Sequence, residues 1–390
     1  MNIAERIESR FRDLFAENPL MVRSPGRVNL IGEHTDYNDG YVLPAAIEKA
    51  MYFALSPRTD HTCSVYSLDK NDSIEFNTDH CVRSKKMWPN YIMGVVDQLV
   101  RSGYSPGGFN CVFGGDIPIG AGLSSSAALE TGLAFGLNEI FHFGVNKMSL
   151  VKLAQRAENE FVGVKCGIMD QYASIFGELN NVLRIDCRSL ESTYYPFNHD
   201  VAIVLFDSRV KHSLASTEYN TRRKECALGV NIIQKTHPTV SSLRDVTKDI
   251  IGSCKNAMDD TVYRRCSFVV EENDRVLKAC TALEQKELKL FGSLMFEAHE
   301  GLRTKYEVSC EELDYLVELV KDNPYVYGAR MMGGGFGGCT INLIQPEKVD
   351  DIGRTVTQKY KKKFGIEPPI YRTVISSGTQ IITTNENAKT

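Results

Sequence analysis

Three segments rich in glycine, serine or polar side chains could carry out chemistry in this chain. The first reads IPIGAGLSSSAALE from residue 117 to residue 130. Gly120 and Gly122 permit unusual backbone angles and close approach to a ligand, and the serines can cap a helix. The first turn of the helix that follows presents free N–H groups at the positive end of the helix dipole. These features suit a phosphate-binding loop, but a capped helix after a tight turn explains them equally well.

The second segment, MMGGGFGGCT, begins at Met331 and contains a literal G-x-G-x-x-G at Gly333, Gly335 and Gly338. A dinucleotide-binding fingerprint requires a strand before these glycines and a helix after them. Here a strand-like run, residues 340–344, follows instead. The sequence therefore disfavours a dinucleotide site. The glycines are better explained by a backbone that passes close to a ligand or to another loop.

The third segment, SPGRVNLIGEHTDYNDG, covers residues 24–40 and is dense in polar groups after a short strand. Glu33, His34 and Asp36 place hydrogen-bond acceptors and donors within four residues, which suits several hydroxyls of one small polyol. Turn chemistry at the Asn-Asp-Gly end of the segment explains part of its polarity. It does not explain the three residues together, so the sequence indicates a polyol site.

Two acidic residues, Glu158 and Asp170, lie in apolar helical stretches. A carboxylate at the start of a helix commonly complements the helix dipole, so Asp170 alone does not identify a catalytic site. Other catalytic templates are absent from the sequence: it has no G-x-S-x-G elbow, no H-R-D or D-F-G pair, and no Walker pattern G-x-x-x-x-G-K-[ST]. The S-x-x-K at Ser149 lacks the K-T-G of a β-lactamase-like enzyme.

Mixed strands and helices must position these segments. A helix with apolar residues from Ile3 to Phe15 opens the chain, and a Ser309-x-x-Glu312 capping box is expected to begin a later helix. A composition shift near residues 195–200 suggests a boundary between two lobes. The expected strands are 28–31, 109–113, 201–206 and 340–344, and the expected helices are 127–141, 150–161, 168–176, 217–234 and 311–320.

Composition excludes several classes of protein. The chain has 390 residues, a length that suggests two to three domains or lobes. Its formal net charge of −4 argues against a protein that binds nucleic acid or an anionic membrane by net positive charge. The longest strongly apolar run, residues 201–206, is too short to span a bilayer, and acidic residues interrupt the N-terminal helix, so neither a membrane anchor nor a targeting signal is expected. Eleven cysteines without CxxC spacing and eight histidines without HExxH spacing favour a reduced, cytoplasmic protein without a zinc knuckle.

Several motifs together resemble a known family. RVNLIGEHTDYN, from Arg27, resembles the galactokinase signature, and GAGLSSSA, from Gly120, resembles the phosphate loop of the GHMP small-molecule kinases. The glycines 333–338 resemble the third motif of these kinases, and CGIMDQ from Cys166 and STEY at 216–219 also match galactokinases. The similarity runs in order from about residue 20 to about residue 345. The first motif is specific for galactokinases, whereas the serine loop identifies only the superfamily.

The resemblance implies a two-lobed α+β fold, with lobes 1–198 and 199–390 and the active site in the cleft between them. It implies ATP and Mg²⁺ as cofactors and phosphorylation of the anomeric hydroxyl of galactose, which gives galactose 1-phosphate and ADP and brings galactose into the Leloir pathway. Asp170 takes the position of the catalytic base, and Arg27 that of the cation that orients it. The positions that match sugar contacts are Glu33, His34, Thr35, Asp36, Gly167, Asp170 and Tyr219.

The resemblance also assigns a nucleotide site and a metal site. Ser126 and Glu158 match the magnesium-binding pair. Trp88 and Tyr91 resemble the residues that flank the adenine, with Ser67 nearby, although a large core aromatic is the alternative for Trp88. No partner beyond galactose and ATP is implied, and we expect a monomer. The residues that match the ATP loop are Gly120, Ala121, Gly122, Leu123, Ser124, Ser125 and Ser126.

One position departs from the family pattern: Met332 stands where a threonine usually precedes the third glycine run, which removes a hydroxyl from that position. Two other functions stay open. One is another sugar-1-kinase, such as an N-acetylgalactosamine kinase, but Thr35 and the run GGGFGG favour galactose. The other is a non-catalytic galactose sensor. Known yeast sensors have lost residues of the serine loop, which is complete here, and this chain also keeps Arg27 and Asp170.

Overall fold

The computed structural model describes residues 1–118, 120–197, 200–210 and 215–383 of the chain, without the side chains of residues 215 and 216. Strands and helices are mixed along it, as expected for the α+β class. No helix of these ranges is long and apolar enough to cross a membrane.

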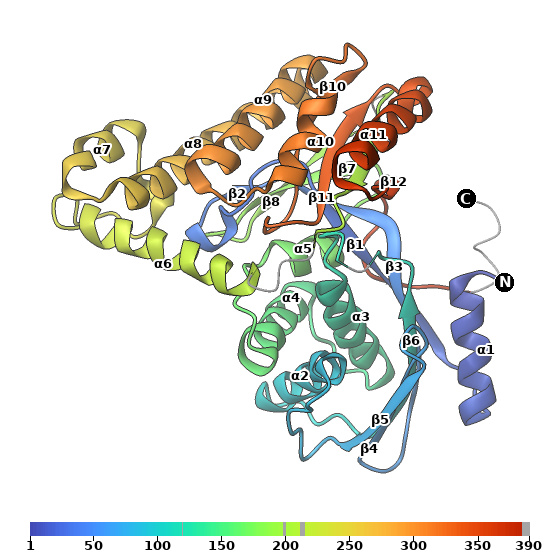
Figure 1. The fold of residues 1–390 in the computed structure, drawn as a ribbon. Coiled ribbons are helices and arrows are strands. Elements are labelled where there is room, and N and C mark those ends of the chain that lie inside the picture. Colours follow the sequence, from blue (N-terminus) through green and yellow to red (C-terminus); the bar gives the residue numbers. More distant parts are fainter. Residues whose placement is uncertain (119, 198–199, 211–214, 384–390) are drawn as a thin grey trace.

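The first half, joined by β13 from the end of the chain, builds a six-stranded sheet of order β13-β1-β3-β6-β4-β5, in which only β4 and β6 pair in parallel. Helices α2, α3 and α5 cover one face, and α1 packs against β3 and β6 on the other side of the sheet (Figure 1). The N-terminal segment therefore forms the predicted helix, which packs on this sheet. The bounds are α1 Ile3–Phe15, β1 Leu20–Asn29, β3 Pro44–Pro57, β4 Thr62–Ser67, β5 Asp72–Asn77, α2 Met87–Arg101, β6 Phe109–Gly115, α3 Ser125–Ile140, α5 Met169–Phe176 and β13 Gln380–Ile381.

The second half builds an antiparallel four-stranded sheet of order β10-β11-β9-β12. Apolar residues of α10 and α11 pack on one face of this sheet, and α9 packs against β10. Helices α6, α7 and α8 extend to the left in Figure 1. The bounds are β9 Ala202–Asp207, α6 Ala215–Ile233, α7 Lys248–Ser253, α8 Asp260–Glu284, α9 Leu288–Gly301, α10 Glu311–Lys321, β10 Val326–Met331, β11 Cys339–Ile344, α11 Val349–Phe364 and β12 Ile370–Thr373.

A third, small sheet joins β2 (Tyr41–Val42), β7 (Asn181–Asp186) and β8 (Ser192–Pro196). Helix α4 (Lys147–Arg156) continues into a π-helical turn at Ala157–Val162, and a second π-helical turn, Leu302–Tyr306, follows α9. A π-helical turn often marks a functional position, because it changes the direction in which side chains leave the helix. Glu158 lies on the first of these turns.

The largest hydrophobic cluster contains residues of both halves, including Val22, Leu55, Leu205, Met295 and Ile341. Strand β13 also returns from the end of the chain to pair with β1. The proposed lobe boundary at 198/199 falls on residues outside the described ranges. The two halves thus share one core.

The expected helices and strands are present with shifted ends, but the capping box at Ser309 is wrong. Helix α10 begins after Cys310, which makes no side-chain cap bond. The Ser309 hydroxyl instead donates to the Asp314 carboxylate at 2.5 Å. A nearby carboxylate accepts this hydroxyl in place of the helix N–H groups.

Candidate active site

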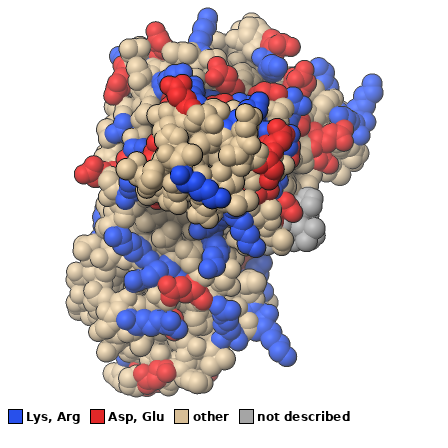
Figure 2. Space-filling view, turned by 90° about the vertical axis from the view of Figure 1, so that its left-hand side faces the viewer, with Lys and Arg blue, Asp and Glu red and all other residues tan. Residues whose placement is uncertain are grey.

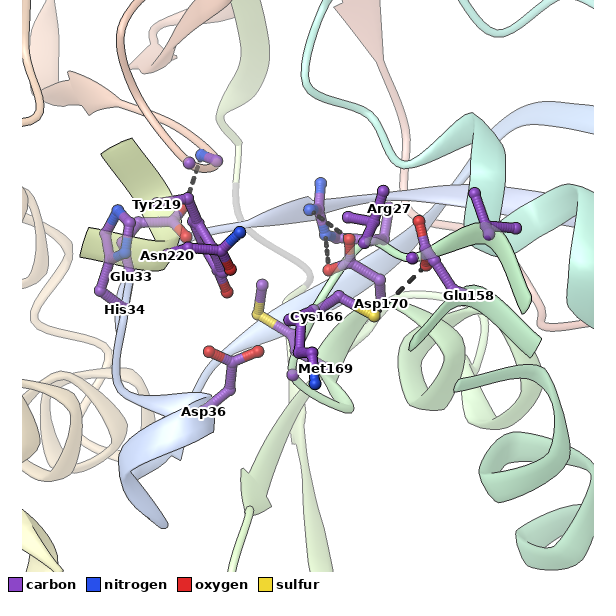
Figure 3. A pocket seen from close by; sticks show the side chains of 17 residues that line it. Arg27, Glu33, His34, Asp36, Glu158, Cys166, Met169, Asp170, Tyr219 and Asn220 are labelled. Atoms are coloured by element: carbon purple, nitrogen blue, oxygen red, sulfur yellow. Dashed lines mark hydrogen bonds and ion pairs between the residues drawn. The ribbon is translucent and has the colours of Figure 1, made fainter. Parts of the chain in front are cut away.

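A cavity of about 320 Å³ lies where the polar segments of the sequence meet. One wall carries Arg27, Asp170 and Glu158, the opposite wall carries Glu33, His34 and Tyr219, and Asp36 lies between them (Figure 3). Gly333 and Gly334 of the glycine-rich segment also line the cavity. Residues far apart in the sequence therefore meet in one polar pocket.

Asp170, in the first turn of α5, forms a two-point ion pair with Arg27 at the end of β1. Arg27 Nε donates to Asp170 Oδ1 at 2.8 Å, and Arg27 Nη2 donates to Oδ2 at 2.9 Å. The Ser124 hydroxyl also donates to Asp170 Oδ2. Burial alone would lower the pKa of Arg27, but the nearby Asp170 and Glu33 raise it above its ordinary value. The geometry holds Arg27 charged and fixes the orientation of the carboxylate.

Glu33 and His34 follow β1 in the polyol-like segment. Glu33 Oε1 accepts the backbone N–H of Gly333 at 2.8 Å and the Arg330 guanidinium at 3.1 Å. His34 has a positive φ of 63°, and its Nδ1 lies 2.8 Å from the hydroxyl of Tyr37. Burial, and then the charge of Arg222, lower the pKa of His34 to about 3. His34 is therefore neutral near pH 7 and can both donate and accept hydrogen bonds.

Asp36 is pressed against Gly167. A Cβ atom added to Gly167 would lie 1.7 Å from Asp36 Oδ2, so any larger residue there would displace this carboxylate. Burial, and then the charge of Asp170, raise the pKa of Asp36 to about 7. Thr35 is buried with its hydroxyl within 2.8 Å of the Gly32 carbonyl oxygen, and it does not line the cavity. Its assigned sugar contact stays a prediction.

Tyr219 of α6 completes the wall opposite Asp170. Its ring lies 5.4 Å from that of His34 and 5.2 Å from that of Tyr37, between ring centroids. Burial, and then Asp36, raise the pKa of the Tyr219 hydroxyl well above its ordinary value, so the phenol stays neutral. An aromatic face beside polar groups is a surface on which the apolar side of a sugar ring can pack.

The serine-rich loop has the backbone that its glycines predict. Gly120 and Gly122 have positive φ values of 82° and 73°, and Ser124, at the N-terminus of α3, is also left-handed. Ser124 makes no side-chain cap bond, because its hydroxyl points to Asp170. A Cβ on Gly333 would lie 3.7 Å from the Gly122 carbonyl oxygen, so the two glycine segments pass side by side. Residue 119 of this loop lies outside the described ranges.

Glu158 is 5% exposed and accepts several hydrogen bonds. Gln171 donates to its Oε2 at 2.8 Å, the Cys166 thiol at 3.3 Å, and Ser126 also hydrogen-bonds to this carboxylate. Burial, and then Asp170, raise the pKa of Glu158. Within the described residues, no group of three or more His, Cys, Asp or Glu side chains could hold a metal. One carboxylate and one hydroxyl still fit Mg²⁺, which takes few protein ligands when it binds a nucleotide.

The three residues assigned to the adenine lie apart from this cavity. The Trp88 ring in α2 lies 5.6 Å from that of Phe113, and its Nε1 donates to Asp72 at 3.2 Å. Ser67, at the end of β4, is buried and pairs with Phe113 across the sheet. Tyr91 follows Trp88 on α2 and is half-buried. The structure thus brings both Ser67 and Trp88 next to Phe113, and none of the three residues lines the 320 Å³ cavity.

Residues of the second half hold the polyol-like segment in place, and none of them was predicted from the sequence. Glu272 Oε1 on α8 accepts the Gly32 N–H at 2.9 Å, and Asn273 Oδ1 accepts the Tyr41 N–H at 2.9 Å. The Tyr306 hydroxyl lies 2.8 Å from that of Tyr37. For Arg330, which donates to Glu33, a signal existed: it is a cation in an apolar strand next to the glycines. For Glu272, Asn273 and Tyr306, no sequence pattern indicates a contact with the polyol-like segment.

Comparisons with known proteins agree with the order of these segments. The model described as the galactokinase galactose-binding signature matches residues 9–57. The models for the GHMP kinase N-terminal and C-terminal domains match residues 90–178 and 279–362.

Whole-chain relatives give the same result. The galactokinase of Roseiflexus sp. (strain RS-1) is 41% identical over 373 residues, which cover 95% of each chain. That of Thermotoga maritima is 41% identical over 364 residues, 93% of this chain and 100% of the relative. The crystal structure of Lactococcus lactis galactokinase complexed with galactose matches at a TM-score of 0.94 and 33% identity, covering 98% of this chain and 100% of that one. The chain therefore belongs to the galactokinase family of the GHMP kinases.

Proposed function

We propose that this protein transfers the γ-phosphoryl group of ATP to the anomeric hydroxyl of galactose, which gives galactose 1-phosphate and ADP. The observation that carries this proposal is the position of Asp170. It lies in the cavity of Glu33, His34 and Asp36 and is hydrogen-bonded to Ser124 of the glycine-serine loop. A sugar hydroxyl and a nucleotide phosphate can therefore meet beside one carboxylate.

Asp170 would accept the proton of the sugar hydroxyl as the phosphoryl group is transferred. A carboxylate is intrinsically a weak base for a hydroxyl, so its benefit lies in orientation and in proton transfer at a late stage. Arg27 fixes both oxygens of Asp170 and donates through Nη1 to the Gly122 carbonyl at 2.6 Å. This cation joins the base to the phosphate loop and favours negative charge that develops during transfer.

The glycine-serine loop and the start of α3 would hold the phosphates of ATP. The N–H groups at the start of α3 and the positive end of its dipole suit an anion without a lysine. Met332 does not supply the hydroxyl that a threonine would. Its side chain is 1% exposed and packs in the core cluster that also contains Ala121 and Leu123. This residue therefore belongs to the same apolar core as two residues of the loop.

Glu158 and Ser126 would hold Mg²⁺, which supplies charge neutralisation for the phosphates when it is bound. We predict that Glu158→Gln raises the Mg²⁺ concentration for half-maximal activity by about tenfold or more, because an ionic ligand is replaced by a neutral one. Activity measured against Mg²⁺ at fixed ATP and galactose tests this. Glu160→Gln is the matched control, since Glu160 is exposed on the same π-helical turn. An unchanged Mg²⁺ dependence of the Glu158 variant would contradict the assignment.

The proposed function is tested by ADP production from ATP with galactose, glucose, N-acetylgalactosamine and arabinose. We expect the highest kcat/KM with galactose. A higher value with N-acetylgalactosamine would indicate the related sugar-1-kinase instead. Galactose binding without ADP production would indicate a sensor. Absence of both galactose binding and galactose-dependent ADP production would overturn the proposal.

A further inference from the structure

Arg330, on β10, is a fully buried cation beside the sugar cavity. The exposed fraction of its side chain is 0%, and that of its partner Glu33 is 3%. A buried charge is costly unless it is paired and hydrogen-bonded, so such a residue requires several partners. Arg330 has these partners in its own strand and in residues 29–33 of the polyol-like segment, which come about 300 residues earlier in the sequence.

The Arg330 guanidinium connects the polyol-like segment to its own strand, β10. Its Nε donates to the Leu30 carbonyl at 2.7 Å, and its Nη1 to the Met331 carbonyl at 2.6 Å. Its Nη2 donates to the Asn29 carbonyl and to Glu33 Oε1 at 3.1 Å. The same cation thus binds the main chain of the polyol-like segment at Asn29 and Leu30 and the Glu33 side chain that lines the cavity.

The Oε1 atom of Glu33 accepts its hydrogen bonds from groups of the protein. This oxygen accepts both Arg330 and the N–H of Gly333, which is part of the glycine-rich segment. The carboxylate cannot rotate without leaving a buried cation unpaired, which is unfavourable. Its other oxygen is therefore held in a fixed direction relative to the cavity that Glu33 lines.

We infer that Arg330 is a positioning residue for sugar recognition, which fixes Glu33 in the cavity so that the free oxygen of this carboxylate can accept a sugar hydroxyl. This inference rests on the proposed sugar-kinase function. Arginine is required because its planar guanidinium reaches carbonyls and a carboxylate in several directions at once, whereas a lysine ammonium is a single point. Arg330 acts through Glu33 and does not line the cavity itself.

A double-mutant cycle on Arg330→Lys and Glu33→Gln tests the inference. Calorimetric titrations of galactose and of ATP are made on the wild type, both single variants and the double variant. We expect Arg330→Lys to weaken galactose binding by about 10-fold to 100-fold, the range for loss of hydrogen bonds to a charged group, and to change ATP binding by less than about twofold. In the Glu33→Gln background the same substitution should weaken galactose binding by less than about threefold.

Arg265→Lys is the matched control. The Arg265 side chain is 3% exposed and is bonded to Glu225, Glu307 and the Lys305 carbonyl, outside the cavity. The substitution Arg265→Lys should lower the unfolding temperature without changing galactose affinity. Equal losses of galactose affinity from Arg330→Lys in both backgrounds, or equal losses of galactose and ATP affinity, would overturn the inference, because they indicate a general structural role.

A second measurement applies if Arg330→Lys does not fold. Arg330→Met and Glu33→Gln each leave one member of the buried pair without its partner, whereas the double variant removes both charges. We expect the double variant to unfold at a higher temperature than Arg330→Met. A lower unfolding temperature would show that the two residues are not coupled. Absence of galactose binding to the wild type would refute the proposed function instead, so the two failures are distinguishable.

Discussion

Asp170 is the residue on which the chemistry depends most directly. Asparagine keeps its size but removes its charge and one acceptor, so Asp170→Asn should lower kcat by about 100-fold to 10,000-fold, the usual range for loss of a general base. Galactose affinity should stay within a few fold, because the other acceptors of the cavity are unchanged. Single-turnover ADP formation and calorimetric galactose binding measure the two effects separately.

Asp186→Asn provides the control for Asp170. Asp186 is also half-buried and paired with an arginine, Arg244 at 2.9 Å, but it does not line the cavity. It should keep near-wild-type kcat. If Asp170→Asn also keeps near-wild-type kcat, Asp170 is not the base.

Asp36 gives a pH dependence of stability whose sign is fixed by its raised pKa. The folded protein keeps the proton of Asp36 up to about pH 7, whereas the unfolded chain loses it near the ordinary value of 3.8. Between these values the folded state binds more protons, so the contribution of Asp36 to the free energy of unfolding falls as pH rises and is lowest above pH 7. Asp36→Asn removes this contribution.

We therefore expect Asp36→Asn to raise the free energy of unfolding relative to the wild type at pH 8, with a smaller difference at pH 5. Urea unfolding of both proteins without galactose at the two pH values measures this. Asp39→Asn, a neighbouring side chain that lies outside the 320 Å³ cavity, is the control. A difference that grows toward pH 5 would contradict the raised pKa.

At the scale of elements, Gly167, which precedes α5, lies directly against Asp36 of the polyol-like segment. Gly167→Ala would place a Cβ 1.7 Å from Asp36 Oδ2, so Asp36 must move. We expect galactose affinity to fall by about tenfold or more, because the displaced Asp36 side chain can no longer hydrogen-bond a sugar hydroxyl from its position in the cavity. Calorimetric titration of galactose measures this.

Gly252→Ala on α7 is the control for Gly167→Ala, because no described atom lies within 4 Å of its added Cβ. Alanine should stabilise this helix slightly and leave galactose affinity unchanged. Unchanged galactose affinity in Gly167→Ala would show that Asp36 can move away without loss of sugar binding.

The sequence predicted those helices and strands whose local residue pattern matches the structure they adopt. The apolar spacing of residues 3–15 predicts α1, and the small residues after Gly120 predict the start of α3. The pattern failed at Ser309, whose hydroxyl meets the Asp314 carboxylate rather than helix N–H groups. It also gave no indication of the π-helical turn at Glu158, because the extra residue in that turn leaves no compositional mark.

The candidate site was predictable where its residues lie within one motif. Glu33, His34 and Asp36 stand together in the sequence, and the cavity contains all three. Their supports were not predictable, because Glu272 and Tyr306 come from distant helical segments and contact the loop only in the folded chain. Residue spacing carries information about local contacts, whereas tertiary partners depend on the packing of both halves.

For the whole molecule, the total charge of −4 describes the surface poorly. On the face drawn in Figure 2, Lys and Arg side chains are prominent in the lower half and near its junction with the upper half. Exposed cations of the first half include Lys152 and Arg156 on α4 and Lys165 beside the cavity. Lys165, exposed beside the polar cavity, is a local cation that can attract a nucleotide despite the acidic total.

The shared core makes a final prediction about the two lobes that we propose, 1–198 and 199–390. The main hydrophobic cluster joins β1 and β3 to α9 and β11, and β13 completes the first sheet from the end of the chain. A fragment of residues 1–198 would therefore expose part of that cluster and lose the strand beside β1. We expect this fragment to lack a cooperative unfolding transition, whereas the full chain should unfold in a single transition.

Calorimetry of the full chain and of the fragment measures this difference. Galactose at 100 times its dissociation constant should raise the free energy of unfolding of the full chain by about 2.7 kcal/mol and should shift its whole transition, because residues of both halves line the cavity. A fragment that unfolds cooperatively by itself, or a galactose shift confined to one of two transitions, would show that the lobes are independent folding units. A single shifted transition would instead mean that sugar binding stabilises both lobes together through the core they share.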